Sequence, residues 1–147
     1  MEGGLNGYGT MSNSNGSKYE GEWLDGKLQG QVKVEYSNGV KYEGQWLNDR
    51  QHGHGTITRR SGSKYQGDWI LGLRHGYGIF TNTTGYSFKG EWRQGVKNGH
   101  GTEKKEDSSS DEESTGTWKD GLKHGEFSIK KGNHSTGFGK YHKGKRQ

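Results

Sequence analysis

Five histidines recur at fixed spacings in the chain, and histidine is the side chain here best suited to bind a metal ion. His52, His75 and His124 occupy one register, and His54 and His100 occupy another. Zinc needs donor atoms within about 2 Å of one point, whereas equivalent positions of neighbouring repeats should lie roughly 10 Å apart. The absence of cysteine also excludes thiolate ligands and thiol catalysis. We therefore expect neither a metal nor another cofactor.

Paired carboxylates and glycine-rich segments are the remaining candidates for catalytic chemistry. Glu20 and Glu22 alternate with Tyr19, Gly21 and Trp23, which is typical of the solvent-facing side of a strand. The Gly-x-Gly pairs recur at a constant period, and the chain lacks a Walker loop and the Gly-x-Gly-x-x-Gly pattern. Serine-hydrolase and metalloprotease motifs are likewise missing. We predict a protein that is not an enzyme and has no catalytic residues.

Aromatic and basic residues together can indicate a nucleic-acid interface. Aromatic residues make up 12% of the chain, and the formal net charge is +5. Base-stacking surfaces place rings beside lysine and arginine, but here the rings alternate with acids and glycines. Stacking between structural repeats is therefore the preferred interpretation, and no nucleic-acid partner is expected.

The tryptophans show how the residues are positioned, because they recur at an almost constant interval. The successive steps are 23, 23, 23 and 26 residues, and a tyrosine follows 23 residues later. These residues are Trp23, Trp46, Trp69, Trp92, Trp118 and Tyr141. A fixed period indicates one small unit copied along the chain, each copy packing on the next.

Each unit contains two strand-like runs. In the first, aromatic and glycine positions alternate with polar ones, as in Tyr42-Glu43-Gly44-Gln45-Trp46. The second carries one apolar residue in constant register, and these residues are Met11, Val34, Ile57, Phe80 and Ile129. Asn15-Gly16 and Asn38-Gly39 between the runs predict tight hairpin turns. The pattern therefore predicts an all-β fold, an elongated single-layer antiparallel sheet of tandem β-hairpins.

Composition agrees with a thin sheet rather than a deep core. Only 23% of the 147 residues are hydrophobic, while 29 are glycine and none is proline. The composition alone resembles that of disordered chains, but the strict period favours folding. No apolar run has membrane-spanning length, and none follows Met1. We therefore expect a cytoplasmic location.

The motif Tyr-x-Gly-x-Trp, followed by glycine near the connector and by Gly-x-Gly, resembles the MORN (membrane occupation and recognition nexus) repeat. The resemblance covers residues 1–147 as one array, with units starting near residues 7, 30, 53, 76, 99 and 125. Ser114 and Gly137 replace the leading aromatic residue in two copies. Val32 and Phe127 replace the second glycine of Gly-x-Gly. From these departures, the C-terminal third is expected to be less regular or to be shaped as a cap.

The resemblance implies a scaffold or adaptor that binds a helical or extended segment of a protein partner in an aromatic groove. The expected groove residues are Tyr19, Trp23, Tyr42, Trp46, Tyr65, Trp69, Phe88 and Trp92. The alternatives are binding of anionic phospholipids such as phosphoinositides, or an accessory domain in a larger assembly. For lipid binding, the expected basic edge comprises Arg50, Arg74, Lys97 and Lys123. The family further suggests a site at the cytoskeleton, a cilium or the membrane periphery.

An acidic, serine-rich insertion interrupts the fourth interval, between Trp92 and Trp118. Residues 106–113 are expected to form a protruding loop. Ser108, Ser109 and Ser110 each have an acid three residues later, which is the pattern that acidophilic kinases favour, so these serines are candidate phosphorylation sites. We expect a monomer, with a dimer through exposed edge strands as the alternative.

Overall fold

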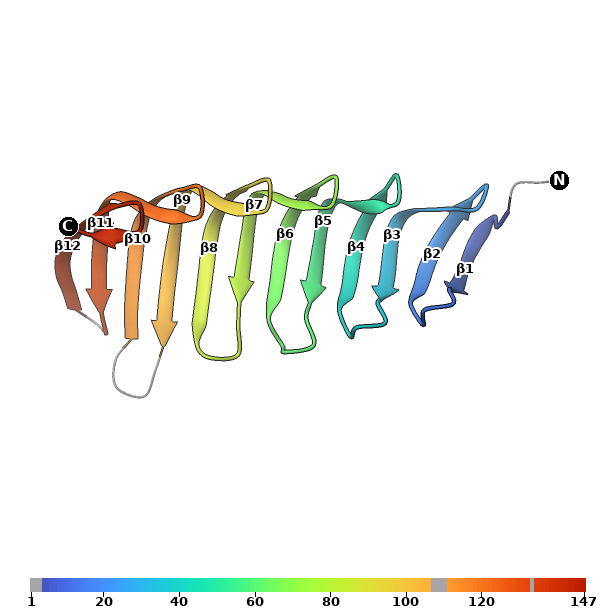
Figure 1. Ribbon diagram of the computed structural model, residues 1–147, viewed down its shortest axis with the longest axis horizontal. Coiled ribbons are helices and arrows are strands. Elements are labelled where there is room, and N and C mark those ends of the chain that lie inside the picture. Colours follow the sequence, from blue (N-terminus) through green and yellow to red (C-terminus); the bar gives the residue numbers. More distant parts are fainter. Residues whose placement is uncertain (1–3, 107–110, 133) are drawn as a thin grey trace. The chain divides into compact units, whose positions relative to one another are not determined.

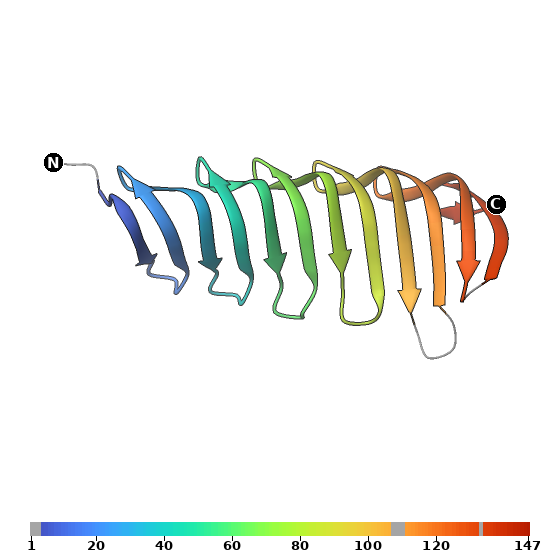
Figure 2. The same cartoon turned by 180° about the vertical axis from the view of Figure 1, so that it is seen from behind.

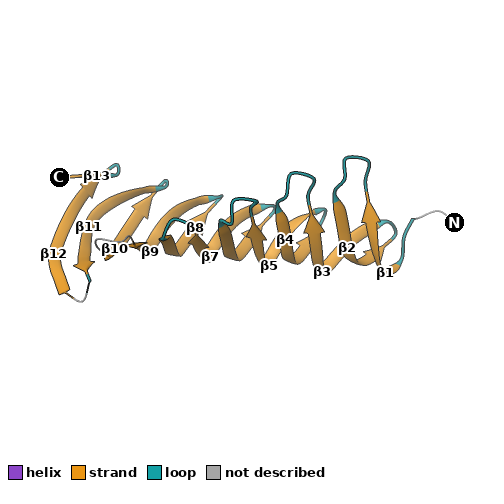
Figure 3. Ribbon diagram, turned by 90° about the horizontal axis from the view of Figure 1, so that it is seen from below, coloured by secondary structure: helices purple, strands orange, loops and turns teal. Residues whose placement is uncertain are grey.

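The described residues of the computed structural model form thirteen antiparallel strands and no helix, which confirms the predicted all-β fold. The structure describes residues 4–106, 111–132 and 134–147. The chain divides into two compact units, Met1–Leu73 and Arg74–Gln147. Figures 1 and 2 show the strands from two sides, and Figure 3 shows the loops and turns that join them.

Within each unit the strands form one layer and pair in the order of the chain. The first unit holds β1 (Gly7–Ser12), β2 (Lys18–Leu24), β3 (Lys27–Glu35), β4 (Lys41–Leu47), β5 (Arg50–Thr58) and β6 (Lys64–Ile70). The second holds β7 (Leu73–Thr81), β8 (Tyr86–Arg93), β9 (Val96–Glu106), β10 (Asp111–Lys119), β11 (Leu122–Lys131), β12 (His134–His142) and β13 (Lys145–Arg146). The first residue of β7 is the last residue of the first unit.

Alternation along each strand separates two chemically different faces. In β4, the residues Tyr42, Gly44 and Trp46 are buried on one side, which we call the aromatic face. Glu43 and Gln45 are exposed on the other side, which we call the polar face. Because the side-chain period of a strand is two residues, the repeated Tyr-x-Gly-x-Trp motif places every ring on the aromatic face.

Glycines on the aromatic face give the rings room to lie on the backbone. Gly44 and Gly55 are cross-strand partners, and a Cβ added at Gly55 would lie 2.1 Å from the hydroxyl oxygen of Tyr42. The same arrangement recurs in the second unit, where a Cβ on Gly101 would lie 2.4 Å from the Phe88 ring. The second glycine of Gly-x-Gly is therefore required for packing.

The polar atoms of several buried rings bond to the backbone, whereas Nε1 of Trp46 is buried without a hydrogen-bond partner among the described residues. Trp69 donates from Nε1 to the carbonyl of Gly55 at 3.0 Å, and Trp23 donates to the carbonyl of Gly9 at 2.9 Å. The Tyr42 hydroxyl donates to the carbonyl of Gln45 at 2.7 Å. For these rings the bonds remove the cost of burying an unpaired polar group, which helps them to form a core although the sheet has one layer.

The tight turns lie at the connectors that follow the tryptophans, where the sequence also places glycine. β2 and β3 meet through Asp25 and Gly26, with φ angles of 50° and 80°. Positive φ at both central residues matches a two-residue type I′ hairpin. The prediction of tight Asn-Gly turns was wrong, because Asn15-Gly16 lies in a loop of five residues, and only Gly16 has positive φ.

The ends of the predicted acidic loop, residues 106 and 111–113, belong to strands β9 and β10. Glu106 pairs with Asp111, and Glu112 and Glu113 pair with Lys105 and Lys104. Cross-strand pairing of acids with lysines favours continuation of both strands. The expectation of a loop was therefore wrong for these ends, and the candidate phosphorylation sites Ser108, Ser109 and Ser110 lie outside the described residues.

Candidate functional site

Most of the rings predicted to line a partner groove are buried in the sheet itself. Tyr42 and Tyr65 are 1% exposed, Phe88 is fully buried, and the four tryptophans of the predicted groove are 5–7% exposed. Only Tyr19 is partly exposed. A buried ring offers little contact area, so these side chains form the floor of the aromatic face rather than its accessible surface.

Edge-to-face contacts connect the buried rings within each unit. In the first unit the Tyr42 and Trp69 centroids are 5.7 Å apart at an interplanar angle of 89°. In the second unit Trp118 lies 4.8 Å from both Phe88 and Phe127, with angles of 76° and 82°. Such contacts stabilise aromatic pairs beyond their buried area, which supports a structural role for the rings.

One long side chain lies opposite each of several tryptophans and helps to cover the rings. In the first unit these pairs are Leu28 with Trp23 and Gln51 with Trp46. In the second unit they are Lys97 with Trp92 and Lys123 with Trp118. The accessible chemistry of the aromatic face is therefore set by this register, which is apolar or neutral in the first unit and basic in the second.

The four residues predicted to form a basic edge do not share one exposed edge. Arg50 is exposed and pairs with Leu47 beside a two-residue turn. Arg74, Lys97 and Lys123 are partly buried on the aromatic face instead. The last three residues lie on the aromatic face because β7, β9 and β11 continue through the segments expected to be connectors.

The cationic side chains of the second unit lie over aromatic rings. The guanidinium of Arg74 is 4.5 Å from the centroid of Trp92, and Arg74 donates to the carbonyl of Gly95 at 2.8 Å. The Lys97 ammonium is 4.7 Å from the Phe88 centroid. The Lys123 ammonium is 4.7 Å from the Tyr141 centroid. Attraction to the ring faces partly compensates these cations for lost water.

A buried carboxylate connects two of these cations. Glu103 is 9% exposed and accepts a hydrogen bond from the Tyr86 hydroxyl at 2.8 Å. The Lys123 ammonium lies 3.0 Å from the other carboxylate oxygen of Glu103. Lys97 in turn donates to the Tyr86 hydroxyl. We call Lys97, Tyr86, Glu103 and Lys123 the buried charge cluster.

The pKa directions within this cluster show which charges the environment favours. Burial opposes ionisation of Glu103, but hydrogen bonds from Lys123 and Tyr86 outweigh it and hold the pKa of Glu103 below its ordinary value. Burial lowers the pKa of Lys97, and repulsion from Lys123, Lys105 and Arg74 adds to that effect while Glu103 opposes it. Burial, followed by the charge of Glu103, raises the pKa of Tyr86. The buried charge cluster therefore contains one ionised carboxylate, Glu103, and two lysines, so its positive charge exceeds its negative charge.

A small hollow lies next to this cluster on the aromatic face. It has a volume of about 290 Å³ and is lined by Arg74, Phe80, Trp92, Val96, Lys97 and Gly121. Its walls thus combine two cations with aromatic and aliphatic surface. That combination suits a group that carries both a negative charge and an apolar body.

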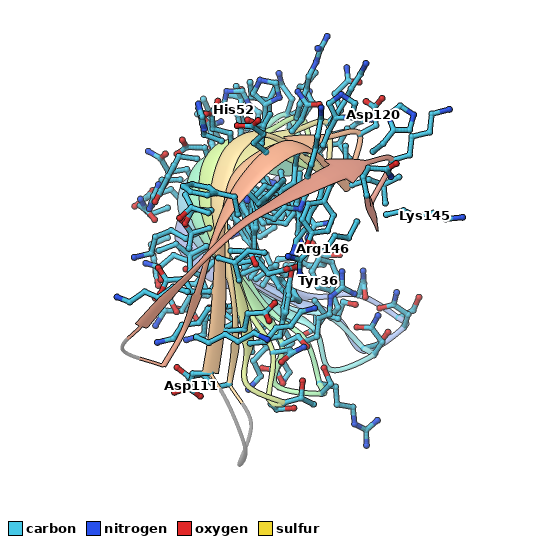
Figure 4. All side chains as sticks on the ribbon, turned by 90° about the vertical axis from the view of Figure 1, so that its left-hand side faces the viewer. Tyr36, His52, Asp111, Asp120, Lys145 and Arg146 are labelled. Carbon is cyan, nitrogen blue, oxygen red and sulfur yellow. The ribbon has the colours of Figure 1, made fainter. Side chains whose placement is uncertain are left out.

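The aromatic face of the first unit carries neutral groups in comparable positions. Tyr36 packs edge-on against Tyr19 with centroids 6.3 Å apart, and Gln51 donates to the Tyr36 hydroxyl at 3.4 Å. Figure 4 shows Tyr36 on the inner side of the curved strands. Tyr19 and Tyr36 are both partly exposed, so they are accessible aromatic groups on this unit.

The polar face of the first unit has a larger but chemically mixed groove of about 670 Å³. Glu20 pairs across strands with Lys33, and Lys33 pairs with Glu43. Opposite charges alternate along this row and stabilise the sheet. Because the charges offset one another locally, this face attracts neither acids nor bases strongly.

The predicted histidine registers do not converge on a metal site in the part of the chain that the structure describes. No three potential ligands among those residues are close enough to hold an ion. His54 instead lies 3.2 Å from Asp68 on the polar face. The described residues also include no helix long and apolar enough to cross a membrane.

Comparison with protein families identifies the class to which this repeated sheet belongs. The MORN repeat model matches residues 1–18, 19–41, 42–64, 65–85, 88–110 and 115–126. These matches span most of the chain, so the chain belongs to the MORN-repeat family and is a repeat module of a class that is generally non-catalytic. A search of curated proteins finds no match to this chain.

Sequence reasoning missed the buried charge cluster, although two signals for it are present. Glu103 occupies the register that holds Val34, Ile57 and Phe80 in earlier units. The register opposite tryptophan changes to lysine at Lys97 and Lys123. A charge at a core position next to basic residues at the neighbouring position would have indicated a buried ion pair.

Proposed function

We propose that this chain is a scaffold or adaptor that binds a segment of a partner protein on its aromatic face. The observation that carries the proposal is the set of partly exposed side chains that flank the buried rings. These are Tyr19 and Tyr36 in the first unit and Phe80, Tyr86 and Lys97 in the second. Large aromatic side chains beside hydrogen-bonding groups are typical of surfaces that dominate protein binding.

The two faces differ in what they offer to a partner. On the polar face of the first unit, acids and lysines pair with one another across strands. On the aromatic face, the rings form a rigid floor and the flanking groups retain exposed surface. A rigid surface loses little conformational entropy when a partner binds, which favours the aromatic face as the binding surface.

Site-specific photo-cross-linking in cell lysate tests this proposal. A benzoylphenylalanine residue would replace Tyr36 on the aromatic face or, as the matched control, Lys33 on the polar face. We expect one dominant cross-linked partner from position 36 and none of that partner from position 33. Equal cross-linking from both positions, or cross-linking only from position 33, would contradict a partner site on the aromatic face.

A second candidate function, binding of anionic phospholipid, rests on exposed aliphatic residues at the two-residue turns of the first unit. Leu24 and Leu47 are 55% and 44% exposed, and their cross-strand partners are Lys27 and Arg50. Aliphatic side chains beside basic ones can insert among anionic lipid headgroups, with about 1 kcal/mol per basic residue near the surface.

Vesicle flotation distinguishes the second candidate. If it holds, vesicles containing phosphatidylserine will bind the wild-type chain, and the double variant Leu24→Ser/Leu47→Ser will bind less. Lys33→Ser is the control, because it removes a positive charge from the polar face. Equal losses for both variants would indicate nonspecific charge attraction rather than insertion at the turns.

A further inference from the structure

We propose that the hollow beside Lys97 binds a carboxylate of the partner segment, carried by an acidic residue next to a large apolar side chain. This inference rests on the proposed function, since it specifies the chemistry of the segment that binds the aromatic face. It also assigns a binding role to the buried charge cluster.

The balance of charge around the hollow is the first argument. Lys97 and Lys123 lie over rings of this unit, and Glu103 is the buried carboxylate of the same cluster. Glu103 is already engaged by Lys123 at 3.0 Å and by Tyr86 at 2.8 Å. One carboxylate beside two lysines leaves the cluster with excess positive charge, and a partner carboxylate would complement it.

The hydrogen-bonding capacity of Lys97 is the second argument. An ammonium has three donors, and within the described part of the chain the single acceptor of Lys97 is the Tyr86 hydroxyl. Its remaining contacts are with the faces of Tyr86 and Phe88. A partly buried ammonium with unused donors gains a charge-assisted bond when a carboxylate enters.

The walls of the hollow specify the apolar part of the ligand. Phe80 is partly exposed, Val96 is 44% exposed, and Trp92 closes the floor. A volume of about 290 Å³ lies at the lower end for small-molecule sites, which start at roughly 300 Å³. The hollow therefore suits one or two side chains of a bound segment rather than a whole cofactor.

The position of the cations favours a protein segment over a membrane surface. Lys97 and Arg74 are partly buried on the aromatic face, whereas a bilayer interacts most strongly with cations that protrude toward the headgroups. An extended or helical segment can bring a single carboxylate into a hollow of this size. The neutral residues Leu28 and Gln51 hold the equivalent register in the first unit, so the anionic contact belongs to the second unit alone.

Selection from a random-peptide display library tests the proposal and does not require the natural partner. The full chain would be immobilised as wild type, as Lys97→Met and as the control Lys89→Met. Lys89 is exposed on β8, so the control removes the same charge without touching the hollow. Bound peptides would be sequenced, and the best would be resynthesised with each acidic residue replaced by its amide.

We expect peptides with an acidic residue beside a large apolar one on the wild-type chain and on Lys89→Met. Lys97→Met should bind them roughly tenfold more weakly or worse, because a close charge pair is lost. The amide peptides should lose a similar factor on the wild-type chain, a readout that holds even if Lys97→Met folds poorly.

Three results would overturn the inference. Selected peptides without acidic residues, or with affinities insensitive to Lys97→Met and to amide replacement, would refute the carboxylate contact and leave the proposed scaffold function intact. Equal losses for Lys97→Met and Lys89→Met would mean nonspecific charge attraction. The third result is that no peptide is selected and the chain instead binds phosphatidylserine vesicles, more weakly in the Lys97→Met variant. That result would contradict the proposed function as well.

Discussion

Phe127 packs against the backbone of Gly116 and fills the space that a missing ring leaves at Ser114. A Cβ on Gly116 would lie 2.7 Å from the Phe127 ring, and Ser114 is buried in the register of Tyr42 and Phe88. In the earlier units the ring comes from the first strand and rests on a glycine of the second. Here the large and small residues have exchanged strands, which preserves the packed volume.

This exchange predicts strong coupling between the two positions. Phe127→Gly should remove about 3–5 kcal/mol of stability, because it leaves a cavity. Ser114→Phe should also destabilise the fold, because its ring would collide with Phe127. The double variant restores the arrangement of the regular unit, so its loss should be smaller than the sum of the single losses. Chemical denaturation of all four proteins measures the coupling, and additive losses would contradict the exchange.

The packing of Tyr42 predicts that Gly55→Ala destabilises the fold by about 2 kcal/mol or more. The new Cβ would collide with the Tyr42 hydroxyl, and overpacking of this kind typically costs about 1–3 kcal/mol. Gly9 holds the same register, but a Cβ added there would meet no atom within 4 Å, so Gly9→Ala is the matched control. Thermal melts of both variants decide the matter, and equal melting temperatures would show that the ring can move away.

The sequence predicts well which strand positions carry the buried rings, and it predicts poorly how exposed each ring is. The difference has a physical reason. The alternation in Tyr42-Glu43-Gly44-Gln45-Trp46 depends only on the two-residue period of a strand, so strand positions and the shared face follow from it. How accessible a ring is depends on the residue across the strand, such as Gln51 opposite Trp46. Gln51 lies in a segment expected to be a connector, and it pairs with Trp46 only because β5 begins at Arg50.

The buried charge cluster shows the same limit at the level of single residues. Glu103 breaks an apolar register, and this break is visible in the sequence. Its partners Tyr86 and Lys123 lie 17 residues before it and 20 residues after it in the chain. Antiparallel pairing brings them together, and the break at Glu103 signals a buried charge without specifying that Tyr86 contacts it.

Glu103 should make stability depend on pH in the acid range. Its pKa in the folded chain is below the ordinary value of 4.5. Its contribution to stability is therefore fully present above the ordinary pKa. The contribution is lost as the pH falls from the ordinary value through the lower folded value. Glu103→Gln should therefore show a flatter decline in melting temperature at acid pH than the wild type. Parallel acid limbs for the two proteins would contradict an ion pair between Glu103 and Lys123.

Glu103→Gln should also lower stability at neutral pH. The substitution leaves the Lys123 ammonium, whose side chain is 13% exposed, without its anionic partner. Removal of one partner of a buried pair typically costs about 3–5 kcal/mol, and the partial exposure of Lys123 places the expected loss at or below about 3 kcal/mol. The exposed pair Lys104–Glu106, at 2.8 Å, provides the control, since Glu106→Gln should cost less than about 1 kcal/mol.

Lys97→Met should preserve stability or raise it by up to about 1 kcal/mol while it weakens the binding of acidic peptides. Burial and neighbouring cations lower the pKa of Lys97, which means that the folded chain disfavours its charge relative to the unfolded chain. Methionine keeps an unbranched apolar side chain over Phe88 and removes that charge. Denaturation curves at neutral pH give the stability, and titration with a selected acidic peptide gives the binding. A variant that loses stability and retains affinity would show that Lys97 is held in the sheet for structural support rather than for recognition of a carboxylate.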